Sequence, residues 1–295
     1  MPTCGEAAAS GSTTPTQARV LRRERRRSVN SGGALPTSSP LFLHLFGGLF
    51  RWWYFRRGFH AVRVSKSGRP ILPDGRPVIV YTNHPSWWDA ALFVLIASRR
   101  FPDRRHFGPM DAAALERYGF MRKFGVFGIE LNTRRGAATF LRTCRAILAD
   151  RRTMLWITAE GQFTDPRQRP VRLRPGLAHL MRLVPEAAVV PLAIEYTFWE
   201  ERYPEALFRF GRAFVPAQEE QAVRGDVAAW QRLLEARLEE AMDGLATESI
   251  RRDASLFEPL MRGAVGVGGI YDLWRQIVAL ITGRPFQREH GKPES

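Results

Sequence analysis

The chain has 295 residues, of which 45% are hydrophobic and 25% are charged, and this length accommodates one large α/β domain or two small ones. Its two cysteines, Cys4 and Cys144, exclude a disulfide framework and a C-x-x-C motif, which fits a reducing compartment. The formal net charge is +15, carried almost entirely by arginine. This charge has two interpretations that stay open: a coding bias toward arginine, and attraction to anionic lipid surfaces, nucleic acid or phosphorylated substrates.

Residues 1–38 are rich in Ser, Thr, Gly, Ala and Pro and contain the run "RVLRRERRRS", which is typical of a disordered basic tail. The N-terminal region is polar and has no apolar run of the kind found in a secretory signal. No aromatic residues alternate with the arginines to stack on bases, so the tail favours solvent or an anionic membrane over nucleic acid.

Residues 39–62 have the layering of a helix that lies at a membrane surface. Apolar residues come first, followed by an aromatic and basic cluster, "RWWYFRR". The longest uncharged apolar stretch, "PLFLHLFGGLF", has about half of the ~20 residues that a spanning helix needs. We therefore expect a membrane-associating segment that holds the protein at the cytoplasmic face of a membrane in a peripheral or monotopic manner. An ordinary helix packed on the domain is the alternative.

Residues 63–260 alternate between strand and helix patterns, which predicts one α/β domain with helices on both faces of its sheet. The predicted strands are "RPVIVYTNH" and residues 126–130, 153–158 and 188–196. The predicted helices are "SWWDAALFVLIASR", with Ser86 as its N-cap, "RGAATFLRTCRAILAD", "LRPGLAHLMRLV" and "DVAAWQRLLEARLEEAMDGLATESI". Residues 261–295 contain "GIYDLWRQIVALITGR" and are expected to form a C-terminal amphipathic helix and tail.

The stretch "VIVYTNHPSWWDAALFVLIA" contains more polar chemistry than the connection of a strand to a helix requires. His84 follows the strand and Asp89 falls in the first helical turn, so local folding can bring the carboxylate to the imidazole. A carboxylate on one ring nitrogen fixes the tautomer and leaves the other nitrogen to act as a base. Spacing alone also allows Asp89 to favour the helix N-terminus and His84 to be a turn residue.

The segment "NHPSWWD" resembles the N-H-x-x-x-x-D signature of the glycerolipid and lysophospholipid acyltransferase family. Further blocks resemble those of the family in the same order: "FGIELNTRRG", "TAEGQF", the basic follow-up "LRPGLAHL", and "AAVVPLAIEY" with its Val-Pro at Val190 and Pro191. The resemblance covers about residues 74–215. Within this family, the sequence is most similar to the 1-acylglycerol-3-phosphate acyltransferases. Two departures lie in a block that this family uses for its acceptor: Thr158-Ala159 stands where Phe-Pro is usual, and Gln162 where threonine is usual.

The resemblance implies a mixed, mostly parallel sheet and an O-acyltransferase that uses no metal or other cofactor. Its donor is the thioester of acyl-CoA or of acyl carrier protein, and its acceptor is a lysophospholipid or a related lipid. His84 is implied as general base and Asp89 as the residue that orients it. The implied substrate-binding residues are Asn83, Arg134, Arg135, Glu160, Gly161 and Arg174, with the arginines holding an anionic head group.

Two other functions remain as alternatives. The departures at residues 158, 159 and 162 are also compatible with an inactive, acyltransferase-like protein whose basic face only binds an anionic membrane. A basic nucleic-acid-binding protein is the other alternative. The charge is spread along the chain, and no recognition-helix, zinc or RNA-binding signature appears, so we expect no nucleic-acid partner.

Overall fold

The computed structural model of the chain describes residues 35–220 and 225–263. Backbone contacts separate Met1–Leu35 from a second unit, Pro36–Ser295, and everything described below belongs to that second unit. The basic tail expected over residues 1–38 lies almost wholly outside the described residues. The C-terminal helix expected within residues 261–295 lies wholly outside them, and only residues 261–263 of that segment are described.

An eight-stranded sheet forms the centre of the domain, in the order β4-β3-β5-β2-β6-β7-β1-β8. Strands β4, β3, β5, β2 and β6 run parallel to one another, whereas β7 is antiparallel to β6 and β8 is antiparallel to β1. The predicted mixed, mostly parallel sheet is therefore confirmed. The strand bounds are β1 Ala61–Ser65, β2 Val78–Thr82, β3 Arg105–Asp111, β4 Val126–Ile129, β5 Thr153–Thr158, β6 Ala188–Thr197, β7 Glu205–Phe210 and β8 Phe257–Arg262.

Four strands, β1, β3, β7 and β8, were not predicted from the sequence. β3 contains Gly108 and Pro109, and β8 contains Pro259, which are residues that interrupt a strand pattern. β1 carries Arg63 at a position that is only 2% exposed, where its guanidinium donates to Glu205 of β7 at 2.9 Å. The domain boundaries expected at 62/63 and 260/261 fall inside β1 and β8.

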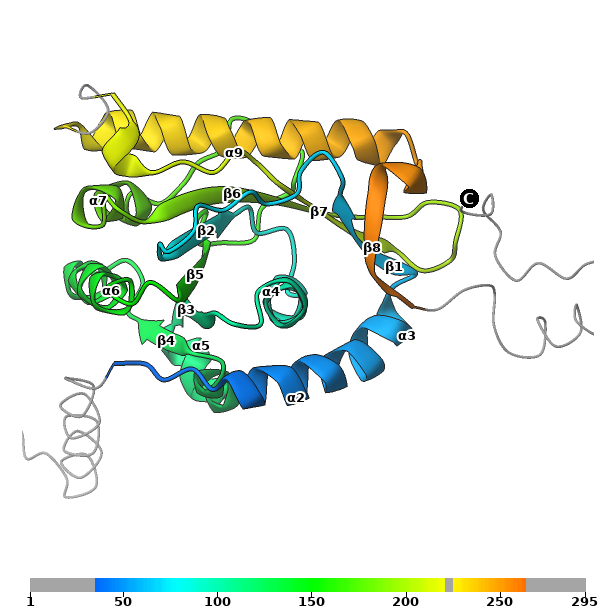
Figure 1. Ribbon diagram of the computed structural model, residues 1–295, viewed down its shortest axis with the longest axis horizontal. Coiled ribbons are helices and arrows are strands. Elements are labelled where there is room, and N and C mark those ends of the chain that lie inside the picture. The colour runs from blue at the N-terminus through cyan, green and yellow to red at the C-terminus, as the bar shows by residue number, and fades with distance from the viewer. Residues whose placement is uncertain (1–34, 221–224, 264–295) are drawn as a thin grey trace, which may run out of the picture. The chain divides into compact units, whose positions relative to one another are not determined.

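Helices cover both faces of the sheet, as the alternating pattern predicts. Helices α6, α7 and α9 pack on one face, and α2 and α4 pack on the other (Figure 1). The α-helical bounds are α2 Pro40–Phe50, α3 Arg56–Gly58, α4 Asp89–Arg100, α5 Ala112–Arg117, α6 Arg134–Ile147, α7 Gly176–Leu183 and α9 Val227–Ile250. A π-helical turn, Arg51–Phe55, joins α2 to α3, and short 3-10 turns lie at Gly119–Lys123, Pro216–Gln218 and Ala254–Leu256.

The helix starts follow local capping chemistry at α6 and α9. Thr133 accepts a hydrogen bond from the Gly136 N–H, and Asp226 accepts from the N–H groups of Ala228 and Ala229. The predicted N-cap at Ser86 is wrong, because α4 begins three residues later, at Asp89. Ser86 lies instead in the turn before the helix, where its N–H donates to the Asp89 carboxylate at 3.3 Å.

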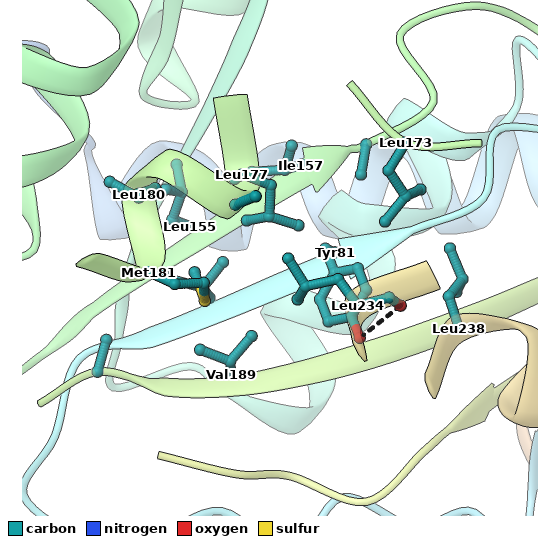
Figure 2. Packing of buried hydrophobic residues seen from close by; sticks show 14 of the residues in the cluster. Tyr81, Leu155, Ile157, Leu173, Leu177, Leu180, Met181, Val189, Leu234 and Leu238 are labelled. Carbon is teal, nitrogen blue, oxygen red and sulfur yellow. Dashed lines mark hydrogen bonds between the residues drawn. The ribbon is translucent and has the colours of Figure 1, made fainter. Parts of the chain in front are cut away.

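The core between the sheet and α9 is apolar and closely packed. Side chains of β2, β5 and α7 meet leucines of α9 there, and the Tyr81 hydroxyl donates to the Leu234 carbonyl at 3.2 Å (Figure 2). Tyr81 and Leu234 are both 0% exposed. The amphipathic pattern of α9 thus places the apolar face of this helix on the sheet. By this packing, α9 supports the strands that carry the site.

Helix α2 has one face on the domain and one face exposed. Leu43 is buried, the Phe42 ring packs at a tilt and the Phe46 ring edge-on against Phe124, and α2 contacts α4. The exposed leucines of this helix are Leu41, Leu45 and Leu49. Among the described residues, no helix combines the length and apolar character that a membrane span requires.

Candidate active site

The candidate site lies beyond the carboxyl ends of β2 and β5, the position where open α/β sheets bind ligands. Thr82 and Thr158, the last residues of these neighbouring parallel strands, are paired in register. His84 and Glu160 each lie two residues further along, and the His84 backbone N–H donates to Glu160 Oε2 at 2.8 Å. The strand register therefore joins two motifs that are far apart in the sequence.

His84 and Asp89 form a close pair, as the sequence predicts. His84 Nδ1 lies 2.6 Å from Asp89 Oδ2. The Asp89 side chain is 0% exposed, whereas that of His84 is 21% exposed. Because a carboxylate accepts, we assign the proton of this contact to Nδ1, which leaves Nε2 as the nitrogen available to act as a base. The spacing of five residues allows the two side chains to meet, because residues 85–88 form a turn before the helix begins.

A cavity of about 770 Å³ adjoins His84. It lies within the ~300–1,000 Å³ range of typical ligand pockets. Its walls come from α2, α4, β3, β4, β5, α6 and α7, and most of the side chains are apolar, including Leu43, Phe93, Val94, Trp156 and Leu177. An elongated hydrocarbon chain suits such a lining better than a polar ligand.

His106 contributes an imidazole to this lining without adding charge. Its Nε2 lies 2.9 Å from the Phe101 carbonyl, and its Nδ1 accepts from the Trp156 indole N–H at 3.1 Å. Burial lowers the pKa of His106 from 6.5 to about 4, so the ring is neutral at pH 7. His106 therefore adds no charge to this part of the cavity wall.

Two aromatic side chains at the mouth of the cavity were not predicted as site residues. Trp87 and Phe163 line the cavity, yet they are 60% and 61% exposed. The Phe163 ring centroid lies 4.5 Å from that of His84. Large apolar groups that line a cavity and also face solvent are typical of a binding mouth. The available sequence signal was their position inside "NHPSWWD" and directly after "TAEGQ".

Gly161 and Arg174 are in close contact. Gly161 has φ +68°, and a Cβ atom built there would lie 2.0 Å from Arg174 Nε. Arg174 lines the cavity, and its Nη1 donates to Asn132 Oδ1 at 2.8 Å. Glu160 is 8% exposed, and burial raises the pKa of its carboxyl, against the opposing effect of the hydrogen bond from the His84 N–H. The glycine thus gives room to an arginine at the cavity.

The other predicted substrate-binding residues lie elsewhere. Asn83 is 1% exposed and is not among the lining residues of the cavity; its amide donates to the Ile194 carbonyl and accepts from the Ile194 N–H, both at 2.9 Å. Asn83 therefore joins the end of β2 to β6, and its predicted substrate-binding role stays a prediction. Arg134 and Arg135 begin α6 with exposed side chains, and neither is among the residues that line the cavity.

The segment that leads to Arg174 is held by an acidic row on α9. Glu239 accepts from the Val171 N–H at 2.8 Å, and Glu235 accepts from the Leu173 N–H at 3.0 Å. One turn further, Asp243 pairs with Arg169. The i, i+4, i+8 spacing of these acidic residues was the only sequence signal for this contact, and it did not identify the partner.

Within residues 35–220 and 225–263, no group of three His, Cys, Asp or Glu side chains is arranged to hold a metal ion.

Residues 63–195 match the family model described as Acyltransferase. This segment contains His84, Asp89, Glu160 and Arg174, together with the cavity walls from α4 to α7. The resemblance that the sequence blocks predict is therefore confirmed over this segment: residues 63–195 are similar to the acyltransferase family.

Among solved structures, the chain is similar to the 1-acyl-sn-glycerophosphate (LPA) acyltransferase PlsC from Thermotoga maritima. The sequence identity is 14%, the TM-score is 0.49, and the match covers 76% of this chain and 83% of that chain. No curated protein matches the sequence.

Proposed function

We propose that this protein is an O-acyltransferase that moves a fatty acyl group from a thioester to a hydroxyl of a lysophospholipid or a related lipid. The observation that carries the proposal is the His84–Asp89 pair, with 2.6 Å between Nδ1 and Oδ2, at an apolar cavity of about 770 Å³. The pair supplies a base, and the cavity supplies space for a hydrocarbon chain.

In the proposed reaction, His84 Nε2 takes the proton of the acceptor hydroxyl while the hydroxyl oxygen attacks the thioester carbonyl carbon. The buried Asp89 holds the imidazole in position and stabilises the imidazolium. The carbon–sulfur bond then breaks, and the proton on Nε2 is available to the leaving sulfur. The new ester keeps the acyl group, and no covalent bond to the protein forms.

The cavity supports an acyl chain as the group that is transferred. Its lining is mainly apolar, and the polar residues among it include the proposed base, His84, together with Asp111, Glu130 and Arg174. Each buried CH₂ group contributes ~0.8 kcal/mol to binding by the hydrophobic effect. The donor is the thioester of acyl-CoA or of acyl carrier protein.

Arg174 is the leading candidate for a contact to an anionic acceptor head group. Among the predicted arginines, it alone lines the cavity. Its Nη1 is bonded to a neutral amide oxygen and not to a carboxylate, so its positive charge is not neutralised by that contact. A guanidinium in this setting suits a phosphate or carboxylate of the acceptor.

The exposed face of α2 supports attachment to an anionic membrane surface. Leu41, Leu45 and Leu49 are 70%, 62% and 53% exposed. Arg56 and Arg57 follow with exposed side chains at the end of the same helical segment. Fully burying one leucine in an apolar environment is worth ~1.5–3 kcal/mol, and this contribution is not screened by salt.

The test of the chemistry is acyl transfer by the purified full chain, with oleoyl-CoA and a mixed lysophospholipid pool in vesicles and with the products identified by mass spectrometry. We expect His84→Ala and Asp89→Asn to lower turnover by orders of magnitude with unchanged circular dichroism. His179→Ala is the matched control, because His179 is exposed on α7 and does not line the cavity. Near wild-type turnover of His84→Ala would exclude the proposed base.

The test of the membrane surface is sedimentation with anionic vesicles at two salt concentrations. We expect Leu45→Glu to release most of the protein, and high salt to release the wild type only partly. Ile250→Glu is the matched control, since Ile250 is 80% exposed at the end of α9. Equal binding of both variants would contradict attachment through α2, and complete release of the wild type by salt would favour a purely electrostatic contact.

A further inference from the structure

Asp89 has two hydrogen-bond partners besides His84: the Ser86 N–H, which donates to Oδ2, and the Tyr196 hydroxyl. Its Oδ2 faces His84 Nδ1 at 2.6 Å, and its Oδ1 accepts from the Tyr196 hydroxyl at 2.7 Å. The carboxylate is 0% exposed, so these contacts replace the water that would otherwise solvate it. Tyr196 comes from β6, whereas His84 lies in the β2–α4 connection and Asp89 is the first residue of α4.

We propose that Tyr196 is a positioning residue of the active site, whose hydroxyl holds the Asp89 carboxylate in the orientation that aligns His84. The proposal rests on the proposed function, because it assigns a task to a residue that acts through the His84–Asp89 pair. Tyr196 contacts the carboxylate and is not among the residues that line the cavity.

The strand register explains why Tyr196 reaches Asp89. Along β6, Val190, Leu192 and Ile194 face α4, and Ala193 faces α9. The period of two places Tyr196 on the α4 side, where Asp89 begins the helix. The Asn83 amide fixes the Ile194 backbone at this point by two hydrogen bonds, so the end of β6 has a defined position relative to His84.

The surroundings of Tyr196 keep its hydroxyl a donor. Burial, together with the Asp89 charge, raises the pKa of the phenol well above 10, so it remains protonated. The ring packs on Phe59, with 5.7 Å between the ring centroids. A donor on Oδ1 restricts rotation of the carboxylate about its Cβ–Cγ bond, and this leaves Oδ2 directed at the imidazole.

Replacing Tyr196 by phenylalanine keeps the ring and removes only the hydroxyl. Oδ1 then has no donor in a site closed to solvent, and the carboxylate gains freedom to turn away from His84. Both substrates still meet the same cavity and the same arginine. The loss therefore belongs to the transition state and not to ground-state binding.

The experiment compares Tyr196→Phe with Tyr81→Phe in the full-length protein, using oleoyl-CoA and the mixed lysophospholipid pool. Tyr81 is the matched control because its buried hydroxyl also donates a hydrogen bond, but to the Leu234 carbonyl on the opposite face of the sheet. For each variant, kcat, the KM of both substrates and the Tm are measured. The ¹H resonance of the His84 Nδ1 proton, assigned by its loss in His84→Ala, is recorded as well.

We expect Tyr196→Phe to lower kcat by about 10- to 100-fold, the loss for a hydrogen bond to a charged group, with each KM within about twofold. The His84 Nδ1 proton resonance shifts in Tyr196→Phe and not in Tyr81→Phe. A kcat of Tyr196→Phe within about twofold of wild type, or an equal loss in Tyr81→Phe, overturns the proposal. If His84→Ala also retains turnover, the proposed function itself is wrong. If His84→Ala is inactive and Tyr196→Phe retains its turnover, only the role proposed for Tyr196 is wrong.

Discussion

Replacing Gly161 by alanine tests whether the backbone at the second motif sets the position of Arg174. Gly161 has φ +68°, a conformation that costs a residue with a Cβ atom ~1–2 kcal/mol. The added Cβ would also lie 2.0 Å from Arg174 Nε and 2.4 Å from Arg174 Cδ, where ordinary contacts between heavy atoms begin at about 3.5 Å. Arg174 must therefore move and give up its 2.8 Å hydrogen bond to Asn132.

The chain offers a matched control in Gly75→Ala. Gly75 has the same φ of +68°, but a Cβ there would meet nothing within 4 Å. Both variants should lose ~1–2 kcal/mol of unfolding free energy from the backbone term, measured by urea denaturation. Only Gly161→Ala should lower kcat/KM for the acceptor, by about tenfold or more, because only it displaces the guanidinium.

The acceptor and donor titrations separate these effects. An increase in acceptor KM that exceeds the change in donor KM follows from a displaced head-group ligand. Equal activity of Gly161→Ala and Gly75→Ala would refute the reasoning, since it would mean that the position of Arg174 does not matter to the reaction. A stability loss in Gly161→Ala with intact activity would leave Gly161 with a purely conformational role.

Three further predictions follow from the same geometry. Arg174→Ala should raise the KM of the acceptor more than that of the donor in steady-state titrations, and equal changes would contradict a head-group role. Because burial lowers the pKa of His106 from 6.5 to about 4, the folded protein binds this proton less tightly than the unfolded chain, and stability is lost as pH falls through this range. Between pH 7 and pH 4.5 the unfolding free energy of the wild type should fall by ~2 kcal/mol more than that of His106→Gln, and equal pH slopes would exclude this source. Glu239→Ala should cost ~1–3 kcal/mol in urea denaturation, because it removes the acceptor of the Val171 N–H. Glu240 is exposed, so the control Glu240→Ala should lower the unfolding free energy by less than ~0.5 kcal/mol. A similar loss in the two variants would count against the contact between α9 and the 169–174 segment.

Local sequence patterns predicted those parts of the fold whose signal lies within one element. β5 was predicted with its observed bounds, Thr153–Thr158, since a run of apolar residues bounded by polar ones is sufficient to define it. The amphipathic spacing of α9 and its cap at Asp226 likewise lie within one stretch. β1 and β8 were not predicted, because their pairing partners are far away in the sequence. Arg63 of β1, for example, indicates an exposed position in the sequence, and its burial is explained only by Glu205 on another strand.

The His84–Asp89 pair was readable from the sequence because both residues lie in one strand–turn–helix unit, five positions apart. The partners that hold this pair were not readable. Glu160 reaches the His84 N–H only through the β2–β5 register, and Tyr196 reaches Asp89 only through the β2–β6 register. The sequence had treated Asn83 and Arg174 alike as substrate ligands, whereas the structure gives Asn83 two hydrogen bonds to the Ile194 backbone and places Arg174 in the cavity lining. A sequence specifies chemistry within the reach of a single turn, whereas contacts across a sheet depend on which strands pair and in what register, and that is decided by burial of the whole core.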